Sequence, residues 1–252
     1  MGTVPGRRPP RSLLLSGGLV LAWVLSLAVL PFSASGQQPW WLVLALVLLR
    51  MQLQTGLFIV AHDAMHRLLW PQHPRCNDAI GSLALAFYAA LPFRFCRRQH
   101  QRHHRRPASR RDPDFPADRR AGALRWYRQF MARYLSYCQL LRLVAAWILL
   151  ALSLVWCTSA SPSAAAASVL QFATLPLLLS SLQLFVFGTY LPHRCQRLPE
   201  RQPHPHSLDL PPWLSLLACF HFGYHREHHD NPGLCWFELP AARARSLLVA
   251  FP

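Results

Sequence analysis

The chain has 252 residues, of which 52% are hydrophobic and only 14% are charged. A soluble domain carries about 25% charged residues, so this composition speaks against a soluble globular protein, and the length fits one domain. Its 26 basic residues, all arginine, outnumber 10 acidic residues, for a formal net charge of +16. Such an excess of positive charge is typical of proteins that bind nucleic acid or an anionic membrane surface. Long apolar segments favour the membrane, and no groove-reading motif accompanies the charge, so we expect no nucleic-acid partner.

Four apolar segments are long enough to cross a bilayer, which takes about 20 residues of helix. In chain order they cover about residues 13–34, 40–61, 137–157 and 169–191. The first has a basic start and a small-residue end, as a signal peptide does, but its apolar run exceeds the roughly 7–15 residues of a signal peptide. We therefore interpret all four as membrane-spanning helices.

A fifth apolar run, residues 79–95, is shorter and ends among arginines. The N-terminus, residues 94–133 and the tail from Arg194 carry nearly all the arginine, while the linkers 35–39 and 158–168 carry no charge. Arginine-rich loops stay cytoplasmic, and four spans place all three basic segments and both termini on that side. A fifth crossing would break this rule. We predict that 79–95 is membrane-associated without crossing, in a single all-α membrane domain with a cytoplasmic helical cap.

Arg50 and the cysteines give less specific signals. Arg50 lies near the middle of the second span, where a charge is costly and is by default functional or paired. A functional role and a structural role beside Gln52 or Gln54 both stay open. The seven cysteines include no C-x-x-C pair, and their odd count supports neither a disulfide framework nor a zinc ribbon.

Eight of the thirteen histidines fall in three short clusters, with the patterns H-x3-H, H-x2-H-H and H-x2-H-H. On a helix, positions i, i+3 and i+4 share a face, so we expect each cluster to present its imidazoles to one point. All three lie on the cytoplasmic side of the predicted topology and can therefore converge. Eight imidazoles exceed the ligands of one metal ion but suit two. The expected ligands are His62, His66, His100, His103, His104, His225, His228 and His229.

Further histidines are less distinctive. His193, just after the fourth span, and His221, four residues before the third cluster, fit additional ligands and structural roles equally well. His73, His204 and His206 stand alone, and a lone histidine is more often a surface or core residue than a ligand.

Four acidic residues near the clusters are candidates to accept the second N–H of a ligand imidazole. For Asp112 and Asp114, a salt bridge with a neighbouring arginine is an equal alternative. The clusters contain few carboxylates, so the carboxylate-rich soluble di-iron bundle is not matched. An all-imidazole pair of irons at a membrane surface points to attack by dioxygen on C–H bonds of a lipid-soluble substrate. The candidates are Asp63, Asp112, Asp114 and Glu227.

The three clusters resemble the histidine boxes of the membrane fatty-acid desaturase and hydroxylase superfamily. Longer stretches are similar to one branch, the bacterial and cyanobacterial beta-carotene ketolases, over about residues 40–240. The resemblance implies that the eight clustered histidines hold two irons. The similar stretches are A-H-D-A-M-H (61–66), D-P-D-F (112–115), F-G-T-Y-L-P-H-R (187–194) and Y-H-R-E-H-H-D-N-P-G-L-C-W-F-E-L-P (224–240).

The resemblance also implies an activity. Ketolases of this branch oxidise the ring methylene at position 4 of beta-carotene to a ketone, by two successive hydroxylations and loss of water. Iron, dioxygen and an electron donor such as ferredoxin are required. The products would be echinenone and canthaxanthin, or astaxanthin from a ring that already bears a hydroxyl. The enzyme would lie in a bacterial inner or thylakoid membrane with its site on the cytoplasmic side, and would take its carotenoid from the bilayer through an apolar tunnel.

One stretch departs from this branch. Residues 105–111, R-R-P-A-S-R-R, are strongly basic where small or acidic residues are frequent. The basic segment 94–133 could dock an acidic ferredoxin and touch anionic lipid headgroups, although its charge also serves as a topology signal. Two other functions stay open: an acyl-lipid desaturase or alkane hydroxylase with the same metal site, and a histidine-rich metal carrier. Carriers place ligands within their spans, which these clusters do not.

Overall fold

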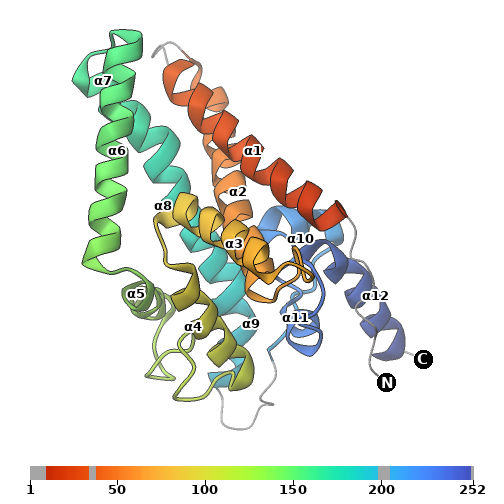
Figure 1. Cartoon of the computed structure of the whole chain (residues 1–252). Coiled ribbons are helices and arrows are strands. Elements are labelled where there is room, and N and C mark those ends of the chain that lie inside the picture. Colours follow the sequence, from red (N-terminus) through yellow and green to blue (C-terminus); the bar gives the residue numbers. More distant parts are fainter. Residues whose placement is uncertain (1–9, 34–37, 198–204, 251–252) are drawn as a thin grey trace.

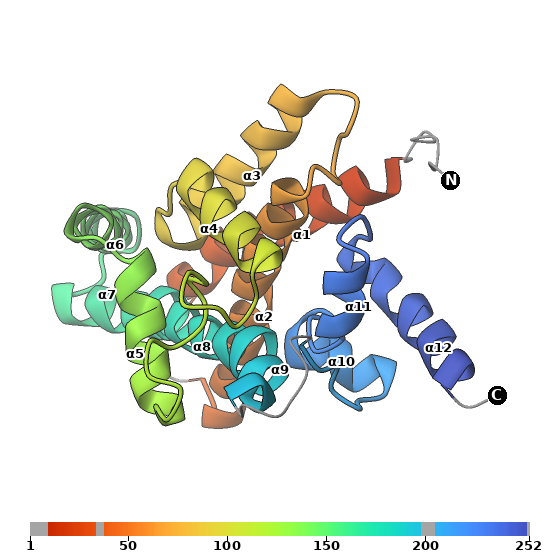
Figure 2. The ribbon, with the colours of Figure 1, turned by 90° about the horizontal axis from the view of Figure 1, so that it is seen from below.

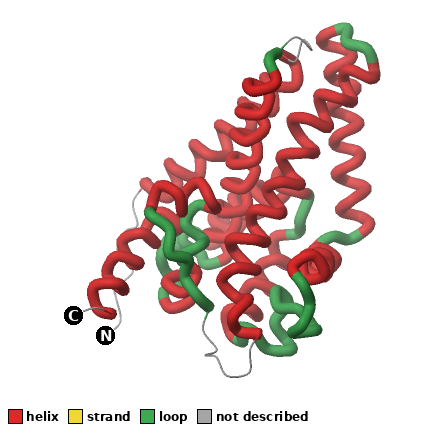
Figure 3. Tube along the Cα trace, turned by 180° about the vertical axis from the view of Figure 1, so that it is seen from behind, coloured by secondary structure: helices red, strands yellow, loops and turns green. Residues whose placement is uncertain are grey.

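The computed structural model describes residues 10–33, 38–197 and 205–250 (Figure 1). Every regular element in these residues is helical and none is a strand (Figure 3), so the prediction of an all-α chain is confirmed. The α-helices are α1 Pro10–Ser33, α2 Trp40–Met65, α3 Pro74–Ala89, α4 Phe93–Arg105, α5 Ala123–Tyr134, α6 Tyr137–Thr158, α7 Pro162–Val169, α8 Leu175–Gln183, α9 Leu191–His193, α10 Pro212–Cys219, α11 His225–Asp230 and α12 Leu239–Ala250. Short 3₁₀ segments are Arg194–Arg197 and Trp236–Glu238, and the π segments are η1 Leu170–Thr174 and η2 Leu184–Tyr190.

Four helical stretches are long and apolar enough to cross a membrane: Arg11–Phe32, Trp40–Met65, Tyr137–Thr158 and Pro162–His193. The second of these, α2, is the central one, and its C-terminal half forms the core. In contrast α1 and α6 bury few of their residues, as helices facing lipid do. Arg-rich α4 and α5 lie within the segment 94–133, which we had interpreted as a loop.

The fourth candidate span begins earlier than residue 169. Pro162 starts the helix, and the Ser161 hydroxyl accepts a hydrogen bond from the Ala164 N–H at 3.2 Å. A serine cap followed by proline at the first helical position is a strong helix start. The uncharged linker expected at 158–168 is therefore helical over its second half, and a continuous run of helix leads from Pro162 to His193.

The fifth apolar run is not a straight helix. Ala90 takes a left-handed conformation with φ 54° and ends α3, and Pro92 precedes α4. The two helices are bent by 98°, and together they are apolar enough for one broken span or a re-entrant element. The absence of a crossing at 79–95 stays a prediction.

Arg50 is a structural residue in this fold. It is 1% exposed, and its Nε donates to the Phe172 carbonyl at 3.0 Å. Pro176, four residues after Phe172, has no N–H with which to satisfy that carbonyl. The guanidinium also donates to the Trp23 carbonyl and to the Ser26 hydroxyl, at 3.1 and 2.8 Å. Its partners are thus not Gln52 or Gln54, and it joins α2 to α1 and to the candidate span Pro162–His193.

Gly81 sets the close approach of α3 to α2. A Cβ at this position would lie 2.6 Å from the Ala64 Cβ and 2.4 Å from the Phe93 ring. We expect Gly81→Ala to lower the free energy of unfolding by about 1–3 kcal/mol, because overpacking forces a helix to shift. Thermal unfolding in detergent measures this. Gly18→Ala, whose Cβ would meet nothing within 4 Å, is the matched control and should not lower stability.

Candidate metal centre

The histidine clusters converge at one end of the molecule. The end of α2 meets α4, α9 and α11 there, away from the start of α2 and from the α6–α7 connection (Figures 1 and 2). Nine histidines fall into two groups, and in each group one nitrogen per ring lies within 4.8 Å of the others. Most of these side chains are buried, so the imidazoles sit inside the protein rather than on its surface.

The first group comprises five histidines from α2, α4 and α11. The Nε2 atoms of His66 and His100 lie 2.7 Å apart, and those of His104 and His228 lie 2.9 Å apart. His62 packs edge-on against His100, with ring centroids 4.3 Å apart. The members are His62, His66, His100, His104 and His228.

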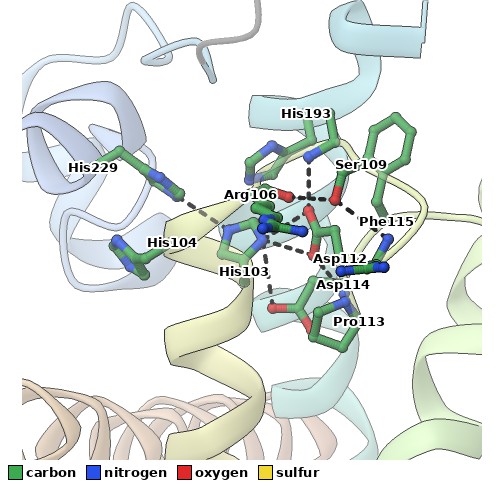
Figure 4. Close-up of polar contacts among 12 residues, drawn as sticks. His103, His104, Arg106, Ser109, Asp112, Pro113, Asp114, Phe115, His193 and His229 are labelled. Carbon is green, nitrogen blue, oxygen red and sulfur yellow. Dashed lines mark hydrogen bonds and ion pairs between the residues drawn. The ribbon is translucent and has the colours of Figure 1, made fainter.

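The second group comprises four histidines from α4, α9 and α11. The Nε2 atom of His225 lies 2.9 Å from that of His193 and 3.1 Å from that of His229. His103 Nε2 is 3.1 Å from His229 Nε2 (Figure 4). His104 of the first group stacks on His229 of the second, with centroids 4.2 Å apart, so the two groups adjoin. The members are His103, His193, His225 and His229.

This geometry fits metal binding. With a metal–imidazole bond of about 2.1 Å, two ligand nitrogens at right angles lie about 3.0 Å apart. The paired Nε2 atoms match that spacing. Neutral imidazole has one donor nitrogen and one acceptor, so converging acceptors repel unless a cation lies between them. Both nitrogens of His62 and the Nδ1 of His225 are buried without a hydrogen-bond partner within the protein, which also fits a metal-ligand role.

We had expected each histidine box to direct its imidazoles to one point, and the two H-x2-H-H boxes do not do so. In both H-x2-H-H boxes the i and i+4 rings enter one group and the i+3 ring enters the other. Helical geometry gives the reason: i+4 lies about 40° from i, whereas i+3 lies about 60° to its other side. The i+3 and i+4 rings therefore diverge by about 100°. As a result α4 and α11 each contribute to both groups.

The rings of α11 are held neutral. Burial, together with the neighbouring imidazoles, lowers the pKa of His225, His228 and His229 well below the usual histidine range. Desolvation disfavours the charged form, and each ring opposes protonation of the next. Neutral imidazole is the form that binds metal ions, so these side chains are ready ligands at neutral pH.

Asp112 orients one of the rings. His103 Nδ1 donates to the two carboxylate oxygens of Asp112 at 2.9 and 3.0 Å (Figure 4). Burial opposes the charge on each partner, yet this hydrogen bond raises the pKa of His103 and lowers the pKa of Asp112. The Ala108 and Asp114 N–H groups also donate to the carboxylate, at 2.8 and 2.9 Å. With Nδ1 protonated, the Nε2 of His103 points its lone pair into the second group.

The other three acidic candidates differ from Asp112. Asp114 lies 3.9 Å from His103 Nδ1, and burial raises its pKa. Asp63 lies 3.7 Å from His62 Nδ1 and accepts the Trp236 N–H at 3.3 Å. Of its two alternatives, Asp112 makes the contact with an imidazole, and the role of that imidazole as a metal ligand stays a prediction.

Glu227 has different partners from those we expected. It accepts hydrogen bonds from the Ser207 hydroxyl and, at 3.2 Å, from Arg243. Arg243 lies in α12 and pairs with Glu227 of the third box across the turn between α11 and α12. No sequence pattern predicts this pair.

The structure also shows which of the remaining histidines belong to the two groups. His193 joins the second group, whereas His221 joins neither and stacks instead on Tyr224 and Trp236. Burial lowers the pKa of His221 to about 4. His73 and His206 lie outside both groups. His204 falls outside the described residues.

A largely apolar cavity of ≈ 200 Å³ reaches the histidines of both groups. Its wall includes His62 and His100 of the first group and His103 and His225 of the second. At its other end Leu140 of α6 and Leu178 of α8 line it, and these residues are 49% and 55% exposed. The cavity therefore extends between two candidate spans towards the lipid-facing surface. The residues of this wall could not be predicted from the sequence, because they come from seven separate segments.

The sequence has known relatives. A sequence model of the fatty acid desaturase family matches residues 38–250. A protein of one Paracoccus strain named beta-carotene ketolase is 39% identical over 240 residues, which cover 93% of each chain. A second Paracoccus protein of that name is 38% identical over 91% of this chain and 90% of its own. A zeaxanthin 4-ketolase of Chlamydomonas reinhardtii is 34% identical over 94% of this chain and 55% of its own.

The grouping of the histidines predicts that substitution of His193 releases metal and that substitution of His221 does not. We expect His193→Ala to lose about one metal ion per chain, because its ring contacts three members of the second group. His221→Ala should retain full occupancy. Elemental analysis of both purified variants measures this, and loss of metal from His221→Ala alone would contradict the grouping.

The hydrogen bond of Asp112 predicts a second effect. Asp112→Asn keeps the shape of the side chain but removes the charge beside His103, and the loss of such a partner typically weakens metal binding about 10- to 100-fold. Chelator competition on the purified protein measures the affinity. Asp118→Asn, in the same loop and paired with exposed Arg125 at 3.2 Å, is the control and should bind metal as the wild type does.

Proposed function

Since the chain belongs to the fatty acid desaturase family, we propose that it is a membrane oxygenase of the ketolase branch. Its substrate would be a beta-carotene-type carotenoid, and its reaction the oxidation of the ring methylene at position 4 to a ketone. The identity of 38–39% with two beta-carotene ketolases over most of both chains supports this branch over the fatty-acid enzymes that share the family.

The observation that carries the proposal is the cavity between the lipid-facing surface and the two histidine groups. A carotenoid is a long apolar molecule dissolved in the bilayer. The cavity is smaller than the roughly 300–1,000 Å³ pockets that enclose a whole drug-sized ligand. It suits the ring end of a polyene whose remainder passes between α6 and α8. The aromatic and aliphatic wall would bind that ring and exclude water from the reacting carbon.

The nine histidines are proposed to hold two iron ions, with His62, His66, His100, His104 and His228 at one and the remaining four at the other. Iron would supply the oxidising power that inserts an oxygen atom of O2 into a ring C–H bond. The protein would position the ring methylene beside the histidines and keep His103 oriented through Asp112. His221 is not part of this proposed ligand set.

The proposed reaction runs twice on one carbon. In each round one oxygen atom of O2 enters a C–H bond, and the other leaves as water with two electrons and two protons from an external donor. The geminal diol that results loses water to become the ketone. One oxidised ring gives echinenone and two give canthaxanthin, while a ring with a hydroxyl at position 3 leads to astaxanthin.

The electron donor is proposed to be a ferredoxin or a similar acidic protein. Arginines on α4 and on the loop after it form an exposed basic surface next to the histidine groups. Such a surface attracts acidic partners and anionic lipid headgroups. Its members are Arg102, Arg105, Arg106, Arg110 and Arg111. We place this surface, the histidines and both termini on the cytoplasmic side of a bacterial inner or thylakoid membrane, with 79–95 not crossing.

Expression in bacteria that accumulate beta-carotene tests the activity. We expect the pigment to redden as ketones extend the conjugation, and chromatography should identify echinenone and canthaxanthin. His228→Ala should abolish conversion because its ring belongs to the first group, whereas His206→Ala should not. Unchanged pigment with altered fatty acids would indicate a desaturase, and unchanged pigment with increased metal uptake would indicate a carrier.

A further inference from the structure

Helix α5 holds the turn 112–115, which carries Asp112. The Nη1 atom of Arg133 lies within hydrogen-bond distance of three carbonyl oxygens of this turn. The indole N–H of Trp126 donates to the remaining carbonyl, that of Asp114, at 2.8 Å. Trp126 and Arg133 are seven residues apart, so they share one face of α5. The three carbonyls bound by Arg133 are those of Asp112 at 3.1 Å, Phe115 at 3.3 Å and Pro113.

A turn of this kind does not satisfy its own carbonyls. Pro113 has no N–H, and residues 112–115 belong to no helix, so no regular hydrogen-bond ladder runs through them. A guanidinium carries five N–H groups in a planar fork and keeps its charge, so it can bind several carbonyls at once. Hydrogen bonds from a charged donor are roughly twice as strong as neutral ones. Arg133 therefore fixes the position of the turn more firmly than a neutral side chain would.

The same turn reaches the histidines through Asp112. Its backbone carbonyl accepts from Arg133, while its carboxylate accepts from His103 Nδ1 at 2.9 Å (Figure 4). The carboxylate also interacts electrostatically with His193. Both rings belong to the second histidine group. A displacement of the turn would therefore move the carboxylate away from the ring that it orients in that group.

We propose that Arg133 is a positioning residue for the second histidine group. By holding the turn 112–115 it keeps the Asp112 carboxylate against His103, and it thereby raises the affinity of that group for its metal ion. This inference rests on the two-iron centre of the proposed function. Arg133 is not a residue of the cavity wall, so its effect on the metal runs through the turn rather than through the substrate.

Chelator competition for Fe²⁺, on the full-length protein in detergent without oxygen, tests the proposal. We expect Arg133→Met to weaken the binding of one of the two ions about 10-fold, the lower end of the loss that follows removal of a partner behind a ligand. Arg133→Lys keeps the charge but lacks the planar fork, so it should weaken the same ion to a smaller extent. This second variant carries the test if Arg133→Met does not fold.

Arg128→Met is the matched control, because it removes the same charge from an exposed position of α5. It should bind both ions as the wild type does.

Two further backgrounds separate positioning from general stabilisation. Beside Asp112→Asn, Arg133→Met should weaken binding by less than about 2-fold more, since substitutions that act through one contact are not additive. Beside His193→Ala, which we expect to keep only the ion of the first group, Arg133→Met should leave the affinity unchanged.

Equal loss of both ions, an undiminished effect beside Asp112→Asn, or wild-type affinity in both Arg133 variants would refute the positioning role while the two-iron centre stands. A wild-type protein that binds no iron would refute that centre, and this inference with it.

Discussion

The arrangement of this molecule depends on nine imidazoles that helix ends bring into one buried space. Each neutral ring has one acceptor nitrogen, and acceptor nitrogens that face one another repel, so the Nε2 pairs at 2.7–3.1 Å favour a bound cation. A bound cation would turn that repulsion into ligation. Metal binding would therefore stabilise the packing of α2, α4, α9 and α11, as it does in other proteins whose ligands come from separate segments.

The two histidine groups are also mutually dependent. Both α4 and α11 divide their rings between the groups, and His104 stacks on His229 where the groups meet. A shift of either helix would change both sites together. Asp112 adds a constraint from the loop after α4, because its carboxylate holds His103 and two backbone N–H groups at once. The position of this loop is thereby tied to the orientation of a ring in the centre.

The candidate span Pro162–His193 connects the apolar part of the molecule with the histidines. Its prolines and π segments interrupt regular hydrogen bonding, which is common near functional sites. One interruption leaves the Phe172 carbonyl to Arg50, and the other carries Gly188 and Thr189 on the cavity wall. An arginine buried deep in a span is acceptable here because backbone carbonyls of neighbouring helices satisfy its guanidinium.

Local properties of the sequence were sufficient for the helical class, the four long apolar helices and eight of the nine converging histidines. Apolar length and i, i+4 spacing are readable within a few turns of chain. The boundary of the fourth helix was missed because the Ser161–Pro162 start signal was taken for a linker. Only tertiary structure decided how the rings divide between the groups, that His193 joins them while His221 does not, and that Glu227 pairs with Arg243 and Arg50 with Phe172. Those outcomes depend on which helix faces pack together across long separations in the chain, and residue spacing within one helix carries no record of that packing.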